Sequence, residues 1–211
     1  SDGADKTIVF KVNHDTLTAD DVVVSNCSFM FNVLSPVAKV LNDLCGIERG
    51  YMNKNKTYKK KQPTQDTIHK DLYRARAAAL SMIPTSTGAA NAIGRVLPEL
   101  KGKLHGSSIR VATPNVSVID LAVSTSREVS IDEVNDAIRQ TAAGAMSGVL
   151  AFTTEPLVSV DLNHRTESSI VALPQTDVVD GRMVRVLAWY DNEWGFATRM
   201  ADTAVAMAKL I

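Results

Sequence analysis

The order of strand-like and helix-like segments is the feature that most limits how this chain can fold. Five segments are typical of strands: residues 7–12, 21–24, 47–61, 107–111 and 116–125. Stretches with helical spacing of apolar residues interrupt them at uneven intervals, as at Phe31, Leu34 and Leu41 before Gly46. This irregular order excludes a regular βαβ alternation. It favours an α+β fold, in which helices cover one face of a large mixed, mostly antiparallel sheet.

Local start and stop signals add three helices and one hairpin. The helices are expected over about residues 86–97, 130–143 and 192–210, the last beginning at Asn192 or Asp191. Ser130 and Glu133 form a capping box, in which each side chain binds a backbone N–H of the other residue. Pro98 should stop the first of these helices. The Asp180–Gly181 pair suits the positive φ angles of a tight turn and predicts a hairpin over residues 178–184.

Charge balance and short apolar runs exclude several kinds of partner. The 211 residues include 23 Lys or Arg and 23 Asp or Glu, so nucleic acid or an anionic membrane is not expected as the main partner. No apolar run is long enough to span a bilayer. Two cysteines are too few for a disulfide framework, and the expected compartment is a reducing cytoplasm. No flexible linker divides the chain, so residues 1–211 are expected to form one domain.

Cofactor and metal motifs are absent from the sequence. None of the 11 glycines lies in a G-x-G-x-x-G or G-x-x-x-x-G-K-[ST] motif, so the backbone cradle for a pyrophosphate is missing. We therefore expect no independent dinucleotide site and no bound cofactor. The four histidines have no metal-binding spacing, so they are interpreted as surface residues and no metal site is expected.

Residues near two expected helix starts carry both a chemical and a structural interpretation. Cys27 precedes a helix, where the helix dipole lowers a thiol pKa, but a small buried thiol is the favoured interpretation. Four residues have the donors for an oxyanion or phosphate pocket: Ser28, Thr87, Gly88 and Arg110. Taken alone, these four are better explained as helix caps and a surface arginine.

A basic stretch ends the third expected strand. Its lysines are Lys54, Lys56, Lys59, Lys60 and Lys61. Only Tyr58 offers an aromatic face there, so binding of single-stranded nucleic acid is disfavoured. We interpret the stretch as an exposed strand edge that lysine keeps soluble.

Five longer strings occur in an order that one enzyme family shares. They are Ser25–Ser28, Ile83–Ala90, Arg110–Ser117, Leu157–His164 and Trp189–Gly195. Together they resemble the catalytic half of the phosphorylating glyceraldehyde-3-phosphate dehydrogenase family and its relative erythrose-4-phosphate dehydrogenase, over essentially the whole chain. The resemblance implies the family's α+β substrate domain and an assembly of identical subunits.

The chain departs from this family at the positions that the resemblance implies for catalysis. Nearly all of the NAD-binding Rossmann domain is missing, and only residues 1–24 resemble its tail. Phe29 stands at the position of the nucleophilic cysteine, and Lys56 at that of the catalytic histidine. Lys59 and Met30 replace two phosphate-contacting threonines.

Other family positions are retained, which implies the remnant of a phosphate and cofactor site. Four residues match phosphate-contacting positions of the family: Ser28, Thr87, Gly88 and Arg110. Lys59 adds positive charge beside them. Asn192 matches the residue that faces the nicotinamide of NAD, the cofactor of the family.

The replacements remove the chemistry that the resemblance implies. The phenyl ring of Phe29 has no lone pair with which to attack an aldehyde, and an exposed lysine at the position of Lys56 stays charged near pH 7. Without a nicotinamide site there is no hydride acceptor. We therefore expect a non-catalytic, isolated substrate domain that acts as a stable, homo-oligomeric scaffold.

Several alternatives stay open at this point. The domain binds phosphate, sulfate or a sugar phosphate weakly, or it is a residual oxidoreductase that needs a separate NAD-binding domain. Lys56 or Lys59 forms a Schiff base if it is buried beside the apolar residues 29–33. Those apolar residues either fill interior space or form a partner surface. Apolar replacement in one region and lysine replacement in another favour an engineered, truncated domain over a degenerate natural paralogue.

Overall fold

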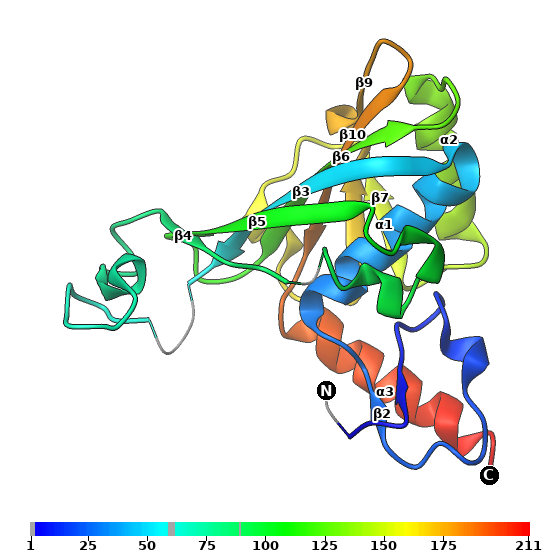
Figure 1. Cartoon of the computed structure of the whole chain (residues 1–211), viewed down its shortest axis with the longest axis horizontal. Coiled ribbons are helices and arrows are strands. Elements are labelled where there is room, and N and C mark those ends of the chain that lie inside the picture. The colour runs from blue at the N-terminus through cyan, green and yellow to red at the C-terminus, as the bar shows by residue number, and fades with distance from the viewer. Residues whose placement is uncertain (1–2, 59–61, 89) are drawn as a thin grey trace.

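An eight-stranded sheet forms the centre of the fold (Figure 1). The computed structural model describes residues 3–58, 62–88 and 90–211. Across the sheet the strands follow the order β4-β5-β3-β6-β10-β8-β7, and β9 pairs with β10. Their bounds are β3 Ile47–Thr57, β4 Ile83–Thr85, β5 Leu104–Val111, β6 Ser117–Thr125, β7 Leu150–Thr153, β8 Ser169–Ala172, β9 Asp177–Val179 and β10 Met183–Tyr190.

Three α-helices occur in the described residues, and none is long and apolar enough to cross a membrane. They are α1 Phe29–Cys45, α2 Ile131–Ala143 and α3 Trp194–Ala208. The 3₁₀ helices are η1 His14–Thr16, η2 Leu72–Ala75, η3 Ile93–Arg95, η4 Pro98–Leu100, η5 Ser159–Leu162 and η6 Leu173–Gln175. Helix α3 begins at Trp194, slightly later than the expected start at Asn192 or Asp191, and Asp191 Oδ1 accepts from the N–H of Trp194 at 2.9 Å.

Strand pairing confirms the predicted mixed and mostly antiparallel sheet. β3 runs parallel to β5, and β7 runs parallel to β8, whereas the other neighbouring strands of this sheet are antiparallel. β3 has a partner on each side: Lys54 lies opposite Ser108 of β5 and Ile119 of β6. The prediction that this lysine-rich strand is a solvated edge is therefore wrong, because the polarity of a strand does not reveal its neighbours. Lys59, Lys60 and Lys61 lie outside the described residues.

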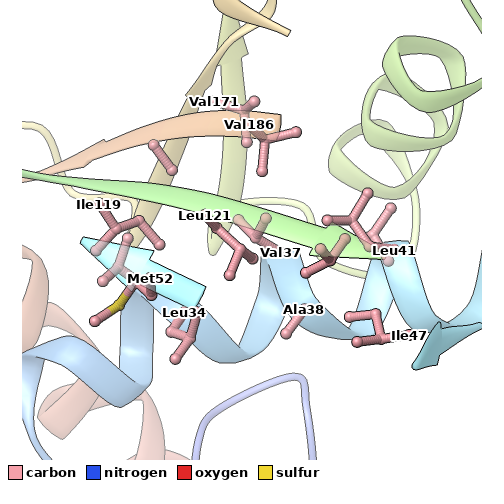
Figure 2. Packing of buried hydrophobic residues seen from close by; sticks show 14 of the residues in the cluster. Leu34, Val37, Ala38, Leu41, Ile47, Met52, Ile119, Leu121, Val171 and Val186 are labelled. Atoms are coloured by element: carbon pink, nitrogen blue, oxygen red, sulfur yellow. The ribbon is translucent and has the colours of Figure 1, made fainter. Parts of the chain in front are cut away.

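Apolar residues along α1 pack onto one face of the sheet. Leu34, Val37 and Leu41 recur at helical spacing and are almost completely buried. Figure 2 shows them beside Met52 of β3 and Leu121 of β6, in the main hydrophobic cluster. Burying each such side chain contributes about 1.5–3 kcal/mol. This packing fixes α1 against β3, which decides where the first residue of α1 lies.

The helix expected over residues 86–97 does not form. The described residues of this segment contain turns and the short helix η3 instead. Gly88 and Gly94 are poor helix formers, and the ring of Pro98 clashes with the carbonyl of Gly94 in an α-helix. A Cβ at Gly94 would lie 2.8 Å from the Cβ of Lys101, so glycine permits a close approach of two chain segments here.

The strand expected over residues 7–12 is much shorter than predicted. Only β1 (Lys6–Thr7) forms, and it pairs in parallel with β2 (Val24–Ser25). The backbone N–H of Val9 donates to the side chain of Asn13 at 2.8 Å, and Lys11 has a positive φ of 59°. These local bonds turn the chain before a longer ladder can form.

The capping box and the hairpin are confirmed. Glu133 accepts from the backbone N–H of Ser130 at 2.9 Å, and Ser130 Oγ accepts from that of Glu133 at 3.2 Å. Asp180 and Gly181 have φ angles of 50° and 67° between the paired strands β9 and β10. Interactions between residues close in the sequence were sufficient to predict both features.

Candidate functional site

Two adjacent hollows lie where β3 ends and α1 begins. The larger one, called the main cleft, has a volume of about 760 Å³, and the smaller one, the side pocket, has about 390 Å³. Phe29 and Lys54 line both. The main cleft also contains Lys56, Thr57, Tyr58, Gln62, His69, Arg74, Arg110, Asn192 and Glu193. The side pocket also contains Ser28, Met30, Phe31, Thr87, Gly88 and Arg95.

Phe29 is the first residue of α1 and is half-buried. Its ring meets that of Phe196 from α3 edge to face, with centroids 4.6 Å apart and planes at 84°. The following apolar residues Met30, Phe31 and Val33 are buried. Of the two alternatives for this apolar cluster, burial favours the one in which it fills interior space.

The two described lysines of β3 enter the hollows at different depths. Side chains two residues apart share one face of a strand, so Lys54 and Lys56 both point toward the start of α1. Lys54 is only 9% exposed, and its Nζ lies 5.4 Å from the ring centroid of Tyr190. Lys56 is half-buried and lies opposite Arg110 of β5 in the strand register. The main cleft therefore receives positive charge from neighbouring strands.

Gln62 positions the side chain of Arg110, because Oε1 of Gln62 accepts a hydrogen bond from the guanidinium of Arg110 at 2.9 Å. Burial lowers the pKa of Arg110, and the nearby positive charge of Arg74 lowers it further, while Asp71 opposes the shift. Arg74 forms an ion pair with Asp71 at 3.0 Å. Nε of Arg110 and Nε2 of Gln62 are buried and have no hydrogen-bond partner among the described residues. These two donors therefore lie inside the wall of the cleft and not on its surface.

The four residues considered for a phosphate pocket are divided between the two hollows. Ser28, Thr87 and Gly88 line the side pocket, whereas Arg110 lines the main cleft. Ser28 has the extended backbone of a helix N-cap, but its side chain makes no cap hydrogen bond. Thr87 Oγ1 contacts Met30 Sδ at 3.7 Å. Lys59, the other residue of the expected phosphate remnant, lies outside the described residues.

Asn192 lines the main cleft but is only 7% exposed. Its Oδ1 accepts from Ser117 Oγ at 2.7 Å, and its Nδ2 donates to Thr57 Oγ1 at 3.3 Å. These bonds join the ends of β3, β6 and β10. The amide of Asn192 therefore has a structural role that the sequence alone did not indicate.

Sequence reasoning missed several side chains of the hollows. Gln62, His69 and Arg74 come from residues 62–81, which the sequence pattern indicates only as a polar loop, and Arg95 lies within the segment 86–97, where the expected helix does not form. No local motif links these residues to β3. Their shared positive or polar character was the only available signal, and it does not reveal where a loop folds.

Neither thiol lines the main cleft or the side pocket. Cys27 contacts the small cluster of Val9, Phe31 and Val96, and burial raises its pKa to about 11. Cys45 is buried at the end of α1, and burial raises its pKa as well. Both observations favour the interpretation of structural thiols. In the described residues, no group of three or more His, Cys, Asp or Glu side chains is placed to hold a metal ion.

Comparison with known proteins gives this geometry a family. The model of the glyceraldehyde 3-phosphate dehydrogenase C-terminal domain matches residues 27–192. The chain belongs to this family. It is 65% identical to glyceraldehyde-3-phosphate dehydrogenase of Cereibacter sphaeroides and 61% identical to that of Xanthobacter flavus, each over 210 residues. Those 210 residues cover 100% of this chain but 63% of each relative.

Membership of the glyceraldehyde 3-phosphate dehydrogenase C-terminal domain family confirms the resemblance and the α+β architecture. It also makes the positions of two side chains relevant to catalysis. Phe29 and Lys56, which the sequence resemblance places at the family's nucleophile and base positions, both line the main cleft. The replaced positions therefore still face one common space.

Proposed function

We propose that this domain is a non-catalytic member of its family and acts as a stable scaffold. The observation that carries the proposal is the ring of Phe29, which occupies the nucleophile position and packs edge to face on Phe196. A phenyl ring cannot form the covalent bond to an aldehyde carbon that a thiolate forms. Cys27 does not substitute for it, because it lines neither hollow and burial raises its thiol pKa to about 11, which keeps the thiol protonated near pH 7.

The dehydrogenase activity named for the relatives also needs a hydride acceptor. This chain has no glycine-rich nucleotide loop and spans 63% of the length of those relatives. The 211 residues contain no such loop, so the proposal rests on the nucleophile position and not on the cofactor.

The test is NADH formation with NAD, phosphate and glyceraldehyde 3-phosphate. We expect no absorbance increase above a control without protein. The variant Phe29→Cys serves as a matched control for the nucleophile, and we expect its new thiol to react with iodoacetamide where the parent residue cannot. NADH production by the unmodified chain would contradict the proposal.

A second candidate function is weak binding of phosphate, sulfate or a sugar phosphate. It is favoured by the cations of the main cleft, where Lys54, Lys56, Arg74 and Arg110 face a single acidic side chain among the lining residues described, Glu193. The guanidinium of Arg110, which lines the cleft, offers charged N–H donors that suit an oxyanion. Met30, which replaces a threonine of the family, removes a hydroxyl from the side pocket, so we expect weak affinity.

Calorimetry with inorganic phosphate tests this second candidate. We expect millimolar binding that weakens with salt. Arg110→Met should lower the affinity about tenfold or more, since a hydrogen bond to a charged group contributes about 1.5–3 kcal/mol. Arg139→Met removes one surface charge on α2, away from the cleft, and should change the affinity little. The absence of heat at millimolar phosphate would rule out this function.

A further inference from the structure

Aromatic side chains give the main cleft a second kind of surface beside its cations. Phe29, Tyr58 and His69 all line it, although they come from α1, from the end of β3 and from residues 62–81. Phe29 and Tyr58 are half-buried and His69 is exposed, so each ring keeps surface that a ligand can contact. The edge-to-face contact with Phe196 restrains the ring of Phe29. A flat apolar group that enters the cleft would therefore meet ring surface that is already positioned.

The uncharged hydrogen-bonding groups of the cleft are much less available. Thr57, Gln62 and Asn192 are each less than a tenth exposed. The amide of Asn192 is bonded to Ser117 and to Thr57 Oγ1, and Oε1 of Gln62 is bonded to Arg110. Nε2 of Gln62 is buried inside the wall of the cleft. These three side chains therefore offer few partners to the hydroxyl groups of a sugar.

Two guanidinium groups face the same cleft, those of Arg110 and Arg74. Burial and the nearby charge of Arg74 both lower the pKa of Arg110, and Asp71, paired with Arg74, offsets part of this charge. An oxyanion between the two groups would reduce their repulsion, and guanidinium N–H groups suit phosphate oxygens. The cleft volume of about 760 Å³ is in the range of small-molecule pockets. The cleft therefore combines an anion-binding side with aromatic surface.

We propose that the main cleft binds aryl phosphates, in which one aromatic ring carries a phosphate group, in preference to sugar phosphates. The proposal rests on the anion binding proposed above and names the class of ligand for that site. The phosphate group contacts the guanidinium groups of Arg110 and Arg74, and the aromatic ring packs against Phe29 and Tyr58. Ring contacts favour the aryl ligand. A sugar phosphate would instead lose water from hydroxyl groups that find few new partners.

Calorimetry with four ligands tests this preference on the unmodified chain. The ligands are inorganic phosphate, glycerol 3-phosphate, cyclohexyl phosphate and phenyl phosphate. We expect phenyl phosphate to bind about tenfold more tightly than inorganic phosphate, because ring contacts add to the same anion interaction. Glycerol 3-phosphate should gain little over inorganic phosphate. Cyclohexyl phosphate, whose ring is apolar but not aromatic, should bind with an affinity between those of inorganic phosphate and phenyl phosphate.

A variant of Phe29 tests the contact with the ligand ring. Phe29→Leu keeps an apolar side chain but removes the ring, so it should reduce the preference for phenyl phosphate over inorganic phosphate about threefold. Circular dichroism checks that the variant is folded. Phe152→Leu is the matched control, because Phe152 is 38% exposed on β7 and lines neither hollow. This control should leave the preference unchanged.

The possible failures are distinguishable. Equal affinity for phenyl phosphate and glycerol 3-phosphate, or for phenyl phosphate and cyclohexyl phosphate, would overturn the aryl preference and leave anion binding standing. An unchanged preference in folded Phe29→Leu would also overturn it, because the ring contact would then not exist. Failure of all four ligands to bind would instead overturn the anion binding on which the proposal rests.

Discussion

At the scale of single residues, the ring of Phe29 links two helices through its contact with Phe196. We expect Phe29→Ala to lower the free energy of unfolding by about 1–3 kcal/mol, less than for a fully buried phenylalanine because the ring is half-buried. Urea unfolding of both proteins measures the difference.

The control for this prediction is a double-mutant cycle with Phe196→Ala. An edge-to-face pair should give a coupling free energy of about 0.5–1.5 kcal/mol. A coupling of zero would mean that the two rings do not stabilise each other.

Cys27 gives a second prediction at this scale, based on its thiol pKa of about 11. We expect the native thiol to react with a disulfide reagent near neutral pH about 100-fold more slowly than the same thiol in the unfolded chain, because its thiolate fraction is lower. Rate measurements in a Cys45→Ala background, with and without urea, isolate this thiol. Equal rates would contradict the buried position.

The same raised pKa affects stability in a defined direction. The folded protein holds the thiol proton more tightly than the unfolded chain, so this contribution is complete below the unfolded pKa, about 8.5. It is lost as the pH rises through about 11. The free energy of unfolding should therefore fall more steeply over this interval than it does in Cys27→Ala.

At the residue scale, the sequence was sufficient to place Phe29 and Lys56 at one site, because long strings around them resemble a known family. It was not sufficient for Lys54 or Arg74. Burial of Lys54 depends on strands β5 and β6, and the position of Arg74 depends on a loop that folds back on β3. Both facts arise from contacts between distant segments.

At the scale of elements, the capping box of α2 is the feature most open to test. Ser130→Ala should lower the free energy of unfolding by about 0.5–2 kcal/mol, because it leaves the Glu133 backbone N–H without its partner. Thermal or urea unfolding measures this loss. Ser130→Gly is the matched comparison and should cost only a few tenths of a kcal/mol relative to serine. Equal stability of the alanine variant would mean that the cap is not formed in solution.

The stabilising contribution of Glu133, the second residue of this capping box, depends on pH. The backbone N–H of Ser130 and the side chain of Arg127 lower the pKa of Glu133. The contribution of Glu133 is therefore present above its unfolded pKa, about 4.3, and is lost as the pH falls below that value. Glu133→Gln should reduce the loss of helix stability on acidification, measured by circular dichroism.

Prediction of elements succeeded where the signal is local and failed where it is not. The capping residues of α2 and the Asp180–Gly181 turn act within a few residues of themselves. The segment 86–97 has helix-like apolar spacing, but Gly94 and Pro98 oppose a helix and the close contact with Lys101 replaces it. The lysines of β3 suggested an unpaired edge strand. The strand is paired on both sides, because side-chain polarity does not determine which strands pair.

At the scale of the whole molecule, the face of the sheet opposite α1 carries exposed apolar side chains. Tyr51 of β3 is 55% exposed, Met183 of β10 is 50% exposed, and both border a shallow hollow with Ala122. We predict that this face joins copies of the chain into a homo-oligomer. Light scattering should give the mass of more than one chain at micromolar concentration.

Charge placed on this face should disrupt the assembly. Tyr51→Asp and Met183→Asp should each shift the mass toward that of a single chain, because a carboxylate is costly to bury in an apolar contact. Val160→Asp changes an exposed apolar residue outside the sheet and should leave the mass unchanged. A single-chain mass for the unmodified protein would contradict the prediction.

The α+β class could be derived from the sequence because the irregular order of elements leaves few other solutions. The exposed apolar side chains on one face of the sheet could not be derived from the sequence. Alternation along a strand shows that there are two faces, but it does not show which face is covered. Only the packing of α1 against Met52 and Leu121 distinguishes the covered face from the open one.

The segment 62–82 extends away from the sheet in Figure 1, where it is drawn in teal, and Ile68 and Leu80 within it are 100% and 85% exposed. The same segment supplies Gln62 and Arg74 to the main cleft. Proteolytic cleavage within this segment would thus leave the eight strands and the α-helices intact. It would, however, release the guanidinium of Arg74 from the main cleft. Phosphate affinity would then reveal cleavage of the chain that a circular dichroism spectrum of the folded protein does not detect.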